Sequence, residues 1–81
     1  MSVALYSLST CPYCRMTRRF LDDKNVEYEL TEVDLLEGQE KEDTVAKIRE
    51  ISGGASFPVV VIDQEVLVGF NKKRMKELLD L

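Results

Sequence analysis

The sequence predicts a single α/β domain whose elements follow the order strand, helix, strand, helix, strand, strand, helix. Short apolar runs alternate with longer segments in which apolar residues recur every three or four positions. The 81 residues are 44% hydrophobic and 32% charged, a balance that supports one small core but not two. We therefore expect one domain over residues 1–81.

The first three elements are expected to form a βαβ unit. Residues 3–7 are a short apolar and aromatic run, which predicts a buried strand. Residues 14–23 predict a helix, with apolar residues at helical spacing at Met16, Phe20 and Leu21. Residues 26–33 alternate apolar and polar side chains, which predicts a second strand. A βαβ crossover makes the two strands parallel and is right-handed.

A second helix is expected between residues 40 and 52. It follows a polar stretch at residues 37–39, and its apolar residues recur at three-residue spacing at Val45, Ile48 and Ile51. The glycines at 53–54 supply a stop, because glycine readily adopts the left-handed conformation that ends many helices.

The last third of the chain predicts a hairpin followed by a helix. Residues 57–62 and 66–68 are apolar runs that flank a polar turn at residues 63–65. Asn71 is suited to cap a final helix, whose apolar residues are Met75, Leu78 and Leu79.

The distribution of charge excludes some functions. The net charge is −4, and residues 27–50 carry nine acidic against three basic side chains. An acidic chain without an aromatic-rich basic surface lacks the electrostatic footprint of a nucleic-acid-binding protein.

No apolar stretch approaches the ~20 residues needed to span a bilayer, and no signal-peptide pattern is present. We therefore expect a soluble, cytoplasmic protein without nucleic-acid or membrane partners.

The two cysteines predict the chemistry. Cys11 and Cys14 enclose only two residues, so a disulfide between them adds little chain-entropy stabilisation. At a helix N-terminus, free N–H groups and the helix dipole lower the pKa of the first thiol, which predicts Cys11 as the nucleophile. Cys14 is then the resolving thiol. Pro12 suits the first helical turn, and Arg15 is expected to give electrostatic support.

Two other interpretations of the cysteines remain. They could be inert, buried small hydrophobes, or they could form half of a zinc site. The chain has no histidine and no second cysteine pair, so it offers only two soft ligands and we expect no metal. A C-x-x-C between a first strand and a helix in a βαβ pattern favours redox chemistry instead.

Residues 6–14, Tyr-Ser-Leu-Ser-Thr-Cys-Pro-Tyr-Cys, resemble the first strand and dithiol site of the glutaredoxin family, and Ser56-Phe57-Pro58 matches its second landmark. The resemblance implies a thioredoxin-like fold, βαβ-α-ββα, with a four-stranded mixed sheet and helices on both faces. It also implies a cis Pro58 facing the sulfurs, which leaves the Phe57 backbone free to pair with a peptide or glutathione. The alternative is an ordinary proline at a strand start.

The same resemblance implies a substrate- or glutathione-binding surface that comprises Pro12, Tyr13, Phe57, Pro58, Gly69, Phe70, Asn71 and Lys72. Tyr13 is expected to pack along the substrate, and Phe70 to pack under the final helix. Glutathione-using members of the family usually carry a cation at the position of Leu8. The Gly69-Phe70 segment resembles the form found in members that accept electrons from a thioredoxin reductase or a comparable reductase. Lys72, Lys73 and Arg74 are expected to form a positive rim with Arg15 and Arg18, or they are solubility charges.

The resemblance thus implies a thiol-disulfide oxidoreductase that reduces protein disulfides or glutathione mixed disulfides through a Cys11–Cys14 disulfide. Glutathione is a possible reductant, and no cofactor is expected to be bound permanently. The alternative is an electron donor, for example to ribonucleotide reductase, that a thioredoxin reductase or similar enzyme regenerates. Two rivals are an iron-sulfur cluster module and an adaptor without turnover. A monomer is the default for so small a domain.

Overall fold

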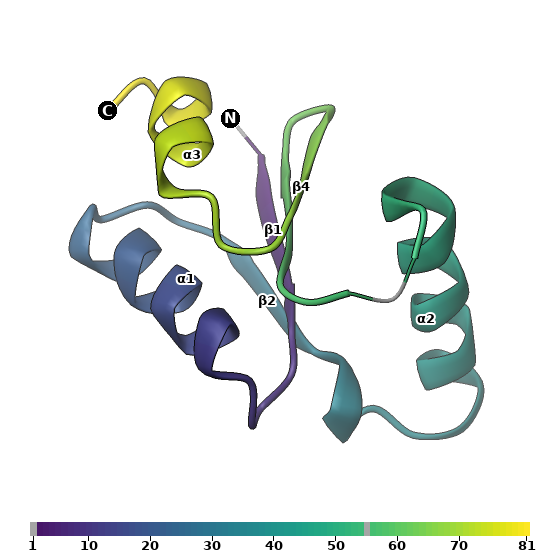
Figure 1. The fold of residues 1–81 in the computed structure, drawn as a ribbon. Helices are drawn as coiled ribbons and strands as arrows, with labels where there is room; N and C mark the ends of the chain where they lie inside the picture. The colour runs from purple at the N-terminus through teal and green to yellow at the C-terminus, as the bar shows by residue number, and fades with distance from the viewer. Residues whose placement is uncertain (1, 55) are drawn as a thin grey trace.

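The computed structural model describes residues 2–54 and 56–81, and within them the chain forms the predicted succession of elements (Figure 1). In chain order they are β1 (Val3–Ser7), α1 (Pro12–Asp23), β2 (Glu29–Glu32), the 3-10 helix η1 (Val33–Leu35), α2 (Gly38–Ser52), β3 (Val59–Ile62), β4 (Glu65–Val68) and α3 (Lys72–Leu79). No described helix is long and apolar enough to cross a membrane.

The four strands form one mixed sheet in the order β2-β1-β3-β4. β1 runs parallel to β2 and antiparallel to β3, and β3 pairs with β4 as a hairpin. The crossover from β1 to β2 is made by α1, as a parallel pair requires. This βαβ-α-ββα arrangement is the thioredoxin-like fold, and it confirms the predicted fold class.

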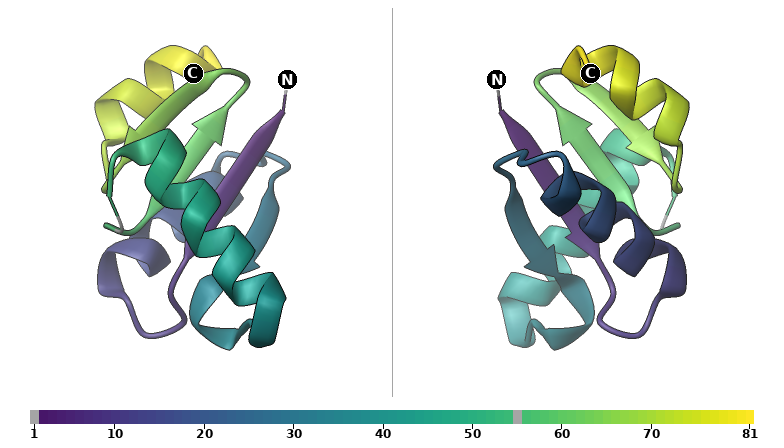
Figure 2. Two further views of the ribbon diagram at one scale, coloured as in Figure 1. Left: turned by 90° about the vertical axis from the view of Figure 1, so that its right-hand side faces the viewer. Right: turned by 90° about the vertical axis from the view of Figure 1, so that its left-hand side faces the viewer.

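Helices cover both faces of the sheet. Figures 1 and 2 show α1 and α3 on one face and α2 on the other. Side chains alternate accordingly along β1 and β3: Leu5 and Val60 pack with Leu21 and Met75 on the first face. On the second face, Val59 packs with residues that include Val33 and Ile48. Because helices pack on both faces of the sheet, the end of β1 is held firmly in the fold, and the loop to α1 starts from this end.

One boundary of the βαβ unit was predicted and another was wrong. Helix α1 begins at Pro12, which confirms the expectation that this proline lies in the first helical turn, where its missing N–H gives up no hydrogen bond. The predicted second strand over residues 26–33 was too long: β2 is only Glu29–Glu32, which pairs with β1 from Ala4↔Glu29 to Ser7↔Glu32, and residues 26–28 form no pair with β1. Val33 then turns into η1 instead of continuing the strand.

The buried face of α1 also differs from the expected one. Phe20 and Leu21 are buried as predicted, but Met16 is 47% exposed and the buried residue beside it is Thr17. The Thr17 hydroxyl donates to the carbonyl of Tyr13 at 2.9 Å, so its polar atom is satisfied inside the helix. A threonine thus occupies the core position, and Met16 is left at the surface.

Helix α2 begins at Gly38, inside the stretch that was expected to be a polar loop. Polar residues suit this first turn, since Glu40 complements the helix dipole and the Gln39 amide donates to Asp43 at 2.8 Å. The predicted stop is confirmed: Gly53 has φ 76°, and its N–H donates to the carbonyl of Arg49 at 3.0 Å.

Candidate active site

The cysteine pair lies at the N-terminus of α1, directly after the loop that follows β1. Cys11 is the residue before the first helical turn and has extended backbone angles, and Pro12 is the first helical residue. The Cys11 N–H donates to the carbonyl of Leu8 at 3.2 Å, which closes the connecting turn. The Cys11 carbonyl accepts from the N–H of Arg15 at 3.1 Å and starts the helical ladder. The first thiol therefore stands at the positive end of the helix dipole, as predicted.

The two thiols differ in exposure. Both cysteines are free, but Cys11 is only partly buried whereas Cys14 is 2% exposed. The sulfur of Cys14 accepts a hydrogen bond from the backbone N–H of Leu8 at 3.4 Å, which fixes it against the end of β1. A dissolved disulfide can therefore reach Cys11 but not Cys14.

The acidities of the two thiols move in opposite directions. Burial alone would raise the pKa of Cys11, but hydrogen bonds from the Cys14 thiol and from the N–H groups of Cys14 and Tyr13 outweigh it and hold the pKa below its ordinary value. Burial raises the pKa of Cys14 to about 11, and the charges of Cys11 and Asp34 act in the same direction. The site thus favours a thiolate on Cys11 and a protonated thiol on Cys14.

A carboxylate from η1 fastens the loop in front of the cysteines. Asp34 accepts from the backbone N–H of Ser9 at 2.9 Å, and its other oxygen accepts from the Ser9 hydroxyl. These hydrogen bonds hold the pKa of Asp34 below its ordinary value, so the group is ionised near neutral pH. Sequence reasoning missed both residues, because they lie 25 positions apart and no local pattern connects them.

A second loop reaches the same end of the sheet. The Phe57–Pro58 peptide bond is cis, which confirms the expected isomer. Antiparallel pairing of Tyr6 with Val59 places Pro58 beside the end of β1, which leads into the cysteines. The N–H of Gly69 donates to the carbonyl of Pro58 at 2.8 Å and brings the start of the α3 loop to the same place. Three segments that are distant in sequence therefore meet at the end of the sheet from which the cysteine loop starts.

The other residues expected in the site occupy distinct positions. Tyr13 is 61% exposed on the first turn of α1. The ring of Phe70 packs edge-on against Phe20 of α1, with ring centres 6.4 Å apart, and it lies against the core cluster to which α3 contributes Met75 and Leu79. Asn71 is the α3 cap, and its side chain accepts from the N–H of Arg74 at 3.1 Å. Lys72 is exposed in the first turn of α3.

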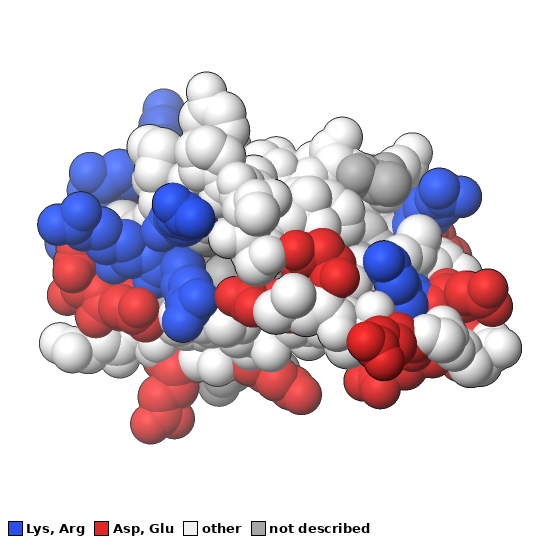
Figure 3. Space-filling view, turned by 90° about the horizontal axis from the view of Figure 1, so that it is seen from below, with Lys and Arg blue, Asp and Glu red and all other residues white. Residues whose placement is uncertain are grey.

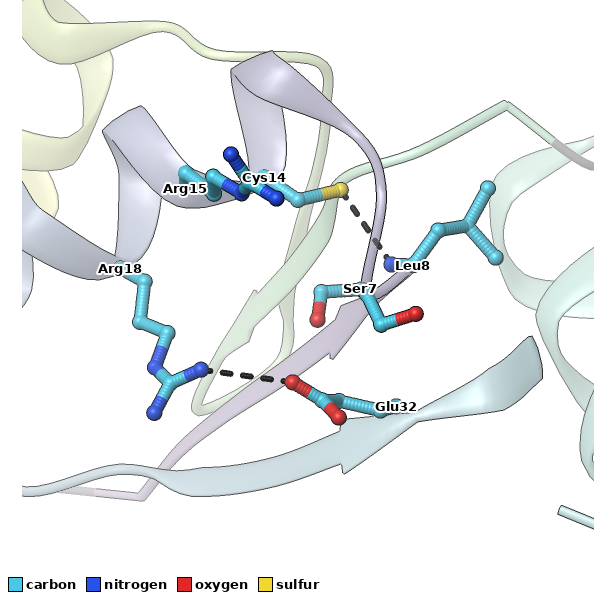
Figure 4. Close-up of a pocket in the computed structure, with 7 residues that line it drawn as sticks. Ser7, Leu8, Cys14, Arg15, Arg18 and Glu32 are labelled. Carbon is cyan, nitrogen blue, oxygen red and sulfur yellow. Dashed lines mark hydrogen bonds and ion pairs between the residues drawn. The ribbon is translucent and has the colours of Figure 1, made fainter. Parts of the chain in front are cut away.

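A small pocket lies on the inner side of Cys14 (Figure 4). It has a volume of about 60 Å³ and is lined by Ser7, Leu8, Ser9, Cys14, Arg15, Arg18 and Glu32. Arg18 and Glu32 form an ion pair of 3.3 Å across it. Arg15 thus borders the pocket of Cys14, and its support of Cys11 stays a prediction. Within residues 2–54 and 56–81, no cluster of three or more histidine, cysteine or acidic side chains could hold a metal ion.

The fold and the site define a class. A reduced C-x-x-C at the start of a helix in a thioredoxin-like domain is the site of a thiol-disulfide oxidoreductase. A family model described as glutaredoxin matches residues 3–67 of the chain. The chain belongs to the glutaredoxin family, and it is a glutaredoxin-like thiol-disulfide oxidoreductase with a dithiol site.

Individual proteins agree with this assignment. The chain is 30% identical over 78 residues to an uncharacterised glutaredoxin-like 8.6 kDa protein in the rubredoxin operon of Clostridium pasteurianum, covering 96% of this chain and 97% of the relative. It is 43% identical over 63 residues to glutaredoxin 1 of Rickettsia prowazekii, but spans only 62% of that protein's length.

Solved structures match over nearly the whole of this chain. The glutaredoxin of Archaeoglobus fulgidus superposes with a TM-score of 0.92 at 41% identity, over 96% of this chain and 85% of the other. The methanoredoxin of Methanosarcina acetivorans also gives 0.92, at 34% identity, over 99% of this chain and 85% of the other.

Proposed function

We propose that this protein reduces disulfides in proteins, and mixed disulfides with glutathione, by a dithiol mechanism in which Cys11 attacks and Cys14 resolves. The observation that carries the proposal is the contrast between the two thiols. Cys11 is accessible and has a lowered pKa, whereas Cys14 is buried and has a pKa raised to about 11. A nucleophile must be both ionised and reachable, and only Cys11 meets both conditions.

The reaction then proceeds in two exchanges. The Cys11 thiolate attacks one sulfur of the substrate disulfide, and the other sulfur leaves as a thiolate that takes a proton. Cys14 loses its proton and attacks the Cys11 sulfur of the mixed disulfide, which releases the second substrate thiol. Two electrons pass from the cysteine pair to the substrate. The product is a Cys11–Cys14 disulfide, which a cytoplasmic reductant returns to two thiols.

The surrounding surface provides the substrate contacts in this proposal. Pro12 and Tyr13 flank Cys11 on α1, and the cis bond at Phe57–Pro58 presents the backbone of Phe57 for pairing with a peptide or with glutathione. The segment Gly69-Phe70-Asn71-Lys72 completes the binding surface at the start of α3. Arg15 supplies positive charge one turn along the helix.

A variant without the resolving thiol tests the roles. Cys14→Ser should accumulate a mixed disulfide between Cys11 and the substrate, visible by mass spectrometry as one added substrate thiol. Cys11→Ser should lower the rate of disulfide reduction by about a thousandfold or more, because its hydroxyl is not ionised near neutral pH. Retained dithiol activity in Cys11→Ser would contradict the assignment.

The source of electrons has two candidates. Glutathione is the first, and the second is a dedicated reductase, such as thioredoxin reductase. Leu8 and the Gly69-Phe70 segment favour the second, because a cation that would pair with a glutathione carboxylate is replaced by leucine. The oxidised protein should be supplied separately with glutathione and its reductase, with thioredoxin reductase, and with a ferredoxin-linked reductase. The system that restores both thiols identifies the donor.

A further inference from the structure

The basic residues near the active site divide into paired and unpaired groups. Arg18 forms an ion pair with Glu32, and Arg74 pairs with Glu77 at 3.1 Å and with Glu65 at 3.9 Å. In α1 and in the first turn of α3, the other cations make no ion pair with any described residue; they are Arg15, Arg19, Lys72 and Lys73. Their charges remain available to a partner.

Two of the unpaired cations border a shallow groove between α1 and α3. The groove has a volume of about 290 Å³ and is lined by Met16, Arg19, Phe20, Asp23, Phe70 and Lys72. Met16 and the edge-on pair of Phe20 and Phe70 make most of its surface apolar. Arg19 and Lys72 contribute positive charge from the two helices.

The groove continues from the dithiol along one face of α1. Tyr13 and Met16 are three residues apart on this helix and are 61% and 47% exposed. Residues at this spacing are neighbours on a helix surface, so a chain that passes Tyr13 beside Cys11 arrives at Met16. The exposed apolar side chains thus form a path from the nucleophile into the groove.

The charges on this side are costly without an anionic partner. Lys72 and Lys73 occupy the first turn of α3, where the helix dipole disfavours cations, and that turn contains no acidic residue. Figure 3 shows basic side chains gathered on the side of the molecule where α1 lies. A carboxylate bound between the two helices would offset this unfavourable charge.

We propose that this groove binds the segment that flanks the disulfide of a protein substrate, and that it selects a segment with an apolar side chain and a nearby carboxylate. The apolar side chain packs on Met16 and Phe70, and the carboxylate lies between Arg19 and Lys72. Asp23 repels a carboxylate at the other end of the groove, which sets the orientation of the segment. The inference rests on the proposed disulfide reduction and names the class of substrate for it.

Peptide substrates test the selectivity. Four disulfide peptides of equal length differ only in the flanking segment: leucine with glutamate, leucine with lysine, serine with glutamate, and serine with lysine. The pre-reduced protein is mixed with each one in a single turnover, so that no electron donor is needed. We expect the leucine–glutamate peptide to react fastest, by about tenfold over the leucine–lysine peptide at low salt. This advantage should shrink at about 0.5 M salt, which screens exposed charges.

Two groove variants and one distant variant locate the effect. Arg19→Glu should slow the leucine–glutamate peptide about tenfold and speed the leucine–lysine peptide. Met16→Ser should remove the preference for leucine over serine. Lys47→Glu, which makes the same charge change on α2 at the opposite face, should alter neither preference. A small neutral disulfide should react equally with all of these proteins.

The possible outcomes distinguish a failure of the groove proposal from a failure of the proposed function. If the neutral disulfide is reduced but the four peptides react alike, the groove does not select substrates and the inference is wrong. It is also wrong if Lys47→Glu matches the effect of Arg19→Glu, because the net charge alone would then decide the rates. If the wild-type protein reduces no disulfide at all, the proposed function fails, and the inference fails with it.

Discussion

Cys11 and Cys14 begin the same helix three residues apart, yet they occupy two different environments. At the mouth of the site, Cys11 is partly exposed and receives hydrogen bonds from N–H groups of the first helical turn. On the floor, Cys14 is 2% exposed and faces the negative charge of Asp34. Identical side chains therefore differ in acidity, because the helix N-terminus stabilises one anion while burial penalises the other.

The contrast shows that the C-x-x-C spacing provides two thiols but does not by itself assign the nucleophilic and the resolving role. These roles depend on three features of the fold: access for the substrate, N–H groups near the first sulfur, and burial of the second sulfur near the negative charge of Asp34. Each of these can be changed separately by mutation or by pH.

The largest expected difference is in reactivity toward a small alkylating agent. With a pKa of about 11, only about one Cys14 in ten thousand is ionised near neutral pH, and the sulfur is also shielded. A brief pulse of iodoacetamide on the reduced protein should label Cys11 at least about a hundredfold faster than Cys14, as measured by mass spectrometry of the digested protein. In denaturant the two rates should converge. Equal labelling of the folded protein would remove the contrast.

A second, smaller effect should appear when Cys11 loses its charge. The Cys14 thiol donates to Cys11, and the Cys11 anion disfavours a second anion nearby, so both interactions keep the proton on Cys14. In Cys11→Ser the pKa of Cys14 should fall below about 11 and stay above its ordinary value, because burial remains. The ultraviolet absorbance of the thiolate against pH measures this shift. An unchanged titration would show that Cys11 does not contribute to the raised pKa of Cys14.

The same change occurs during the proposed reaction. When Cys11 enters a mixed disulfide, its anion disappears, and Cys14 becomes easier to ionise at the step where it must attack. Formation of the mixed disulfide therefore prepares the resolving thiol.

The smallest of the three effects should come from Asp34. In a Cys11→Ser background, Asp34→Asn removes one negative charge near Cys14 and still offers polar atoms to Ser9. The pKa of Cys14 should fall further, by less than the change produced by Cys11→Ser, because Asp34 is the weaker of the two causes. The titration that follows the thiolate absorbance measures it.

A matched control separates a local from a general charge effect. Glu50→Gln removes one negative charge from an exposed position on α2, and it should leave the pKa of Cys14 unchanged. If Glu50→Gln and Asp34→Asn shift the pKa equally, the carboxylate beside Ser9 has no specific influence on the floor of the site.

Much of the fold could be predicted because its signals are local. Apolar periodicity and the glycine stop located α2, and Asn71 was identified as the cap of α3. Boundaries were less accurate where tertiary pairing decides them. The alternation over residues 26–33 predicted a strand of eight residues, but β1 provides partners only for Glu29–Glu32.

The site was predictable to the extent that its residues are neighbours in sequence. Cys11, Pro12 and Cys14 carry their own signal, and the family resemblance added the cis bond at Pro58. The hydrogen bonds from Ser9 to Asp34 and from Gly69 to Pro58 could not be predicted, because they join residues 25 and 11 positions apart and depend on strand register.

The sequence by itself determined the order of the elements, the position of two thiols at a helix N-terminus, and the stretches of like charge, since all of these depend on neighbouring residues. The tertiary structure decided which thiol is buried and which acid lies beside it. It also decided that Arg18 and Arg74 are paired while Arg19 and Lys72 stay unpaired at a groove. The physical reason is that burial and ion pairing depend on which segments pack together, and packing brings together residues that no local pattern relates.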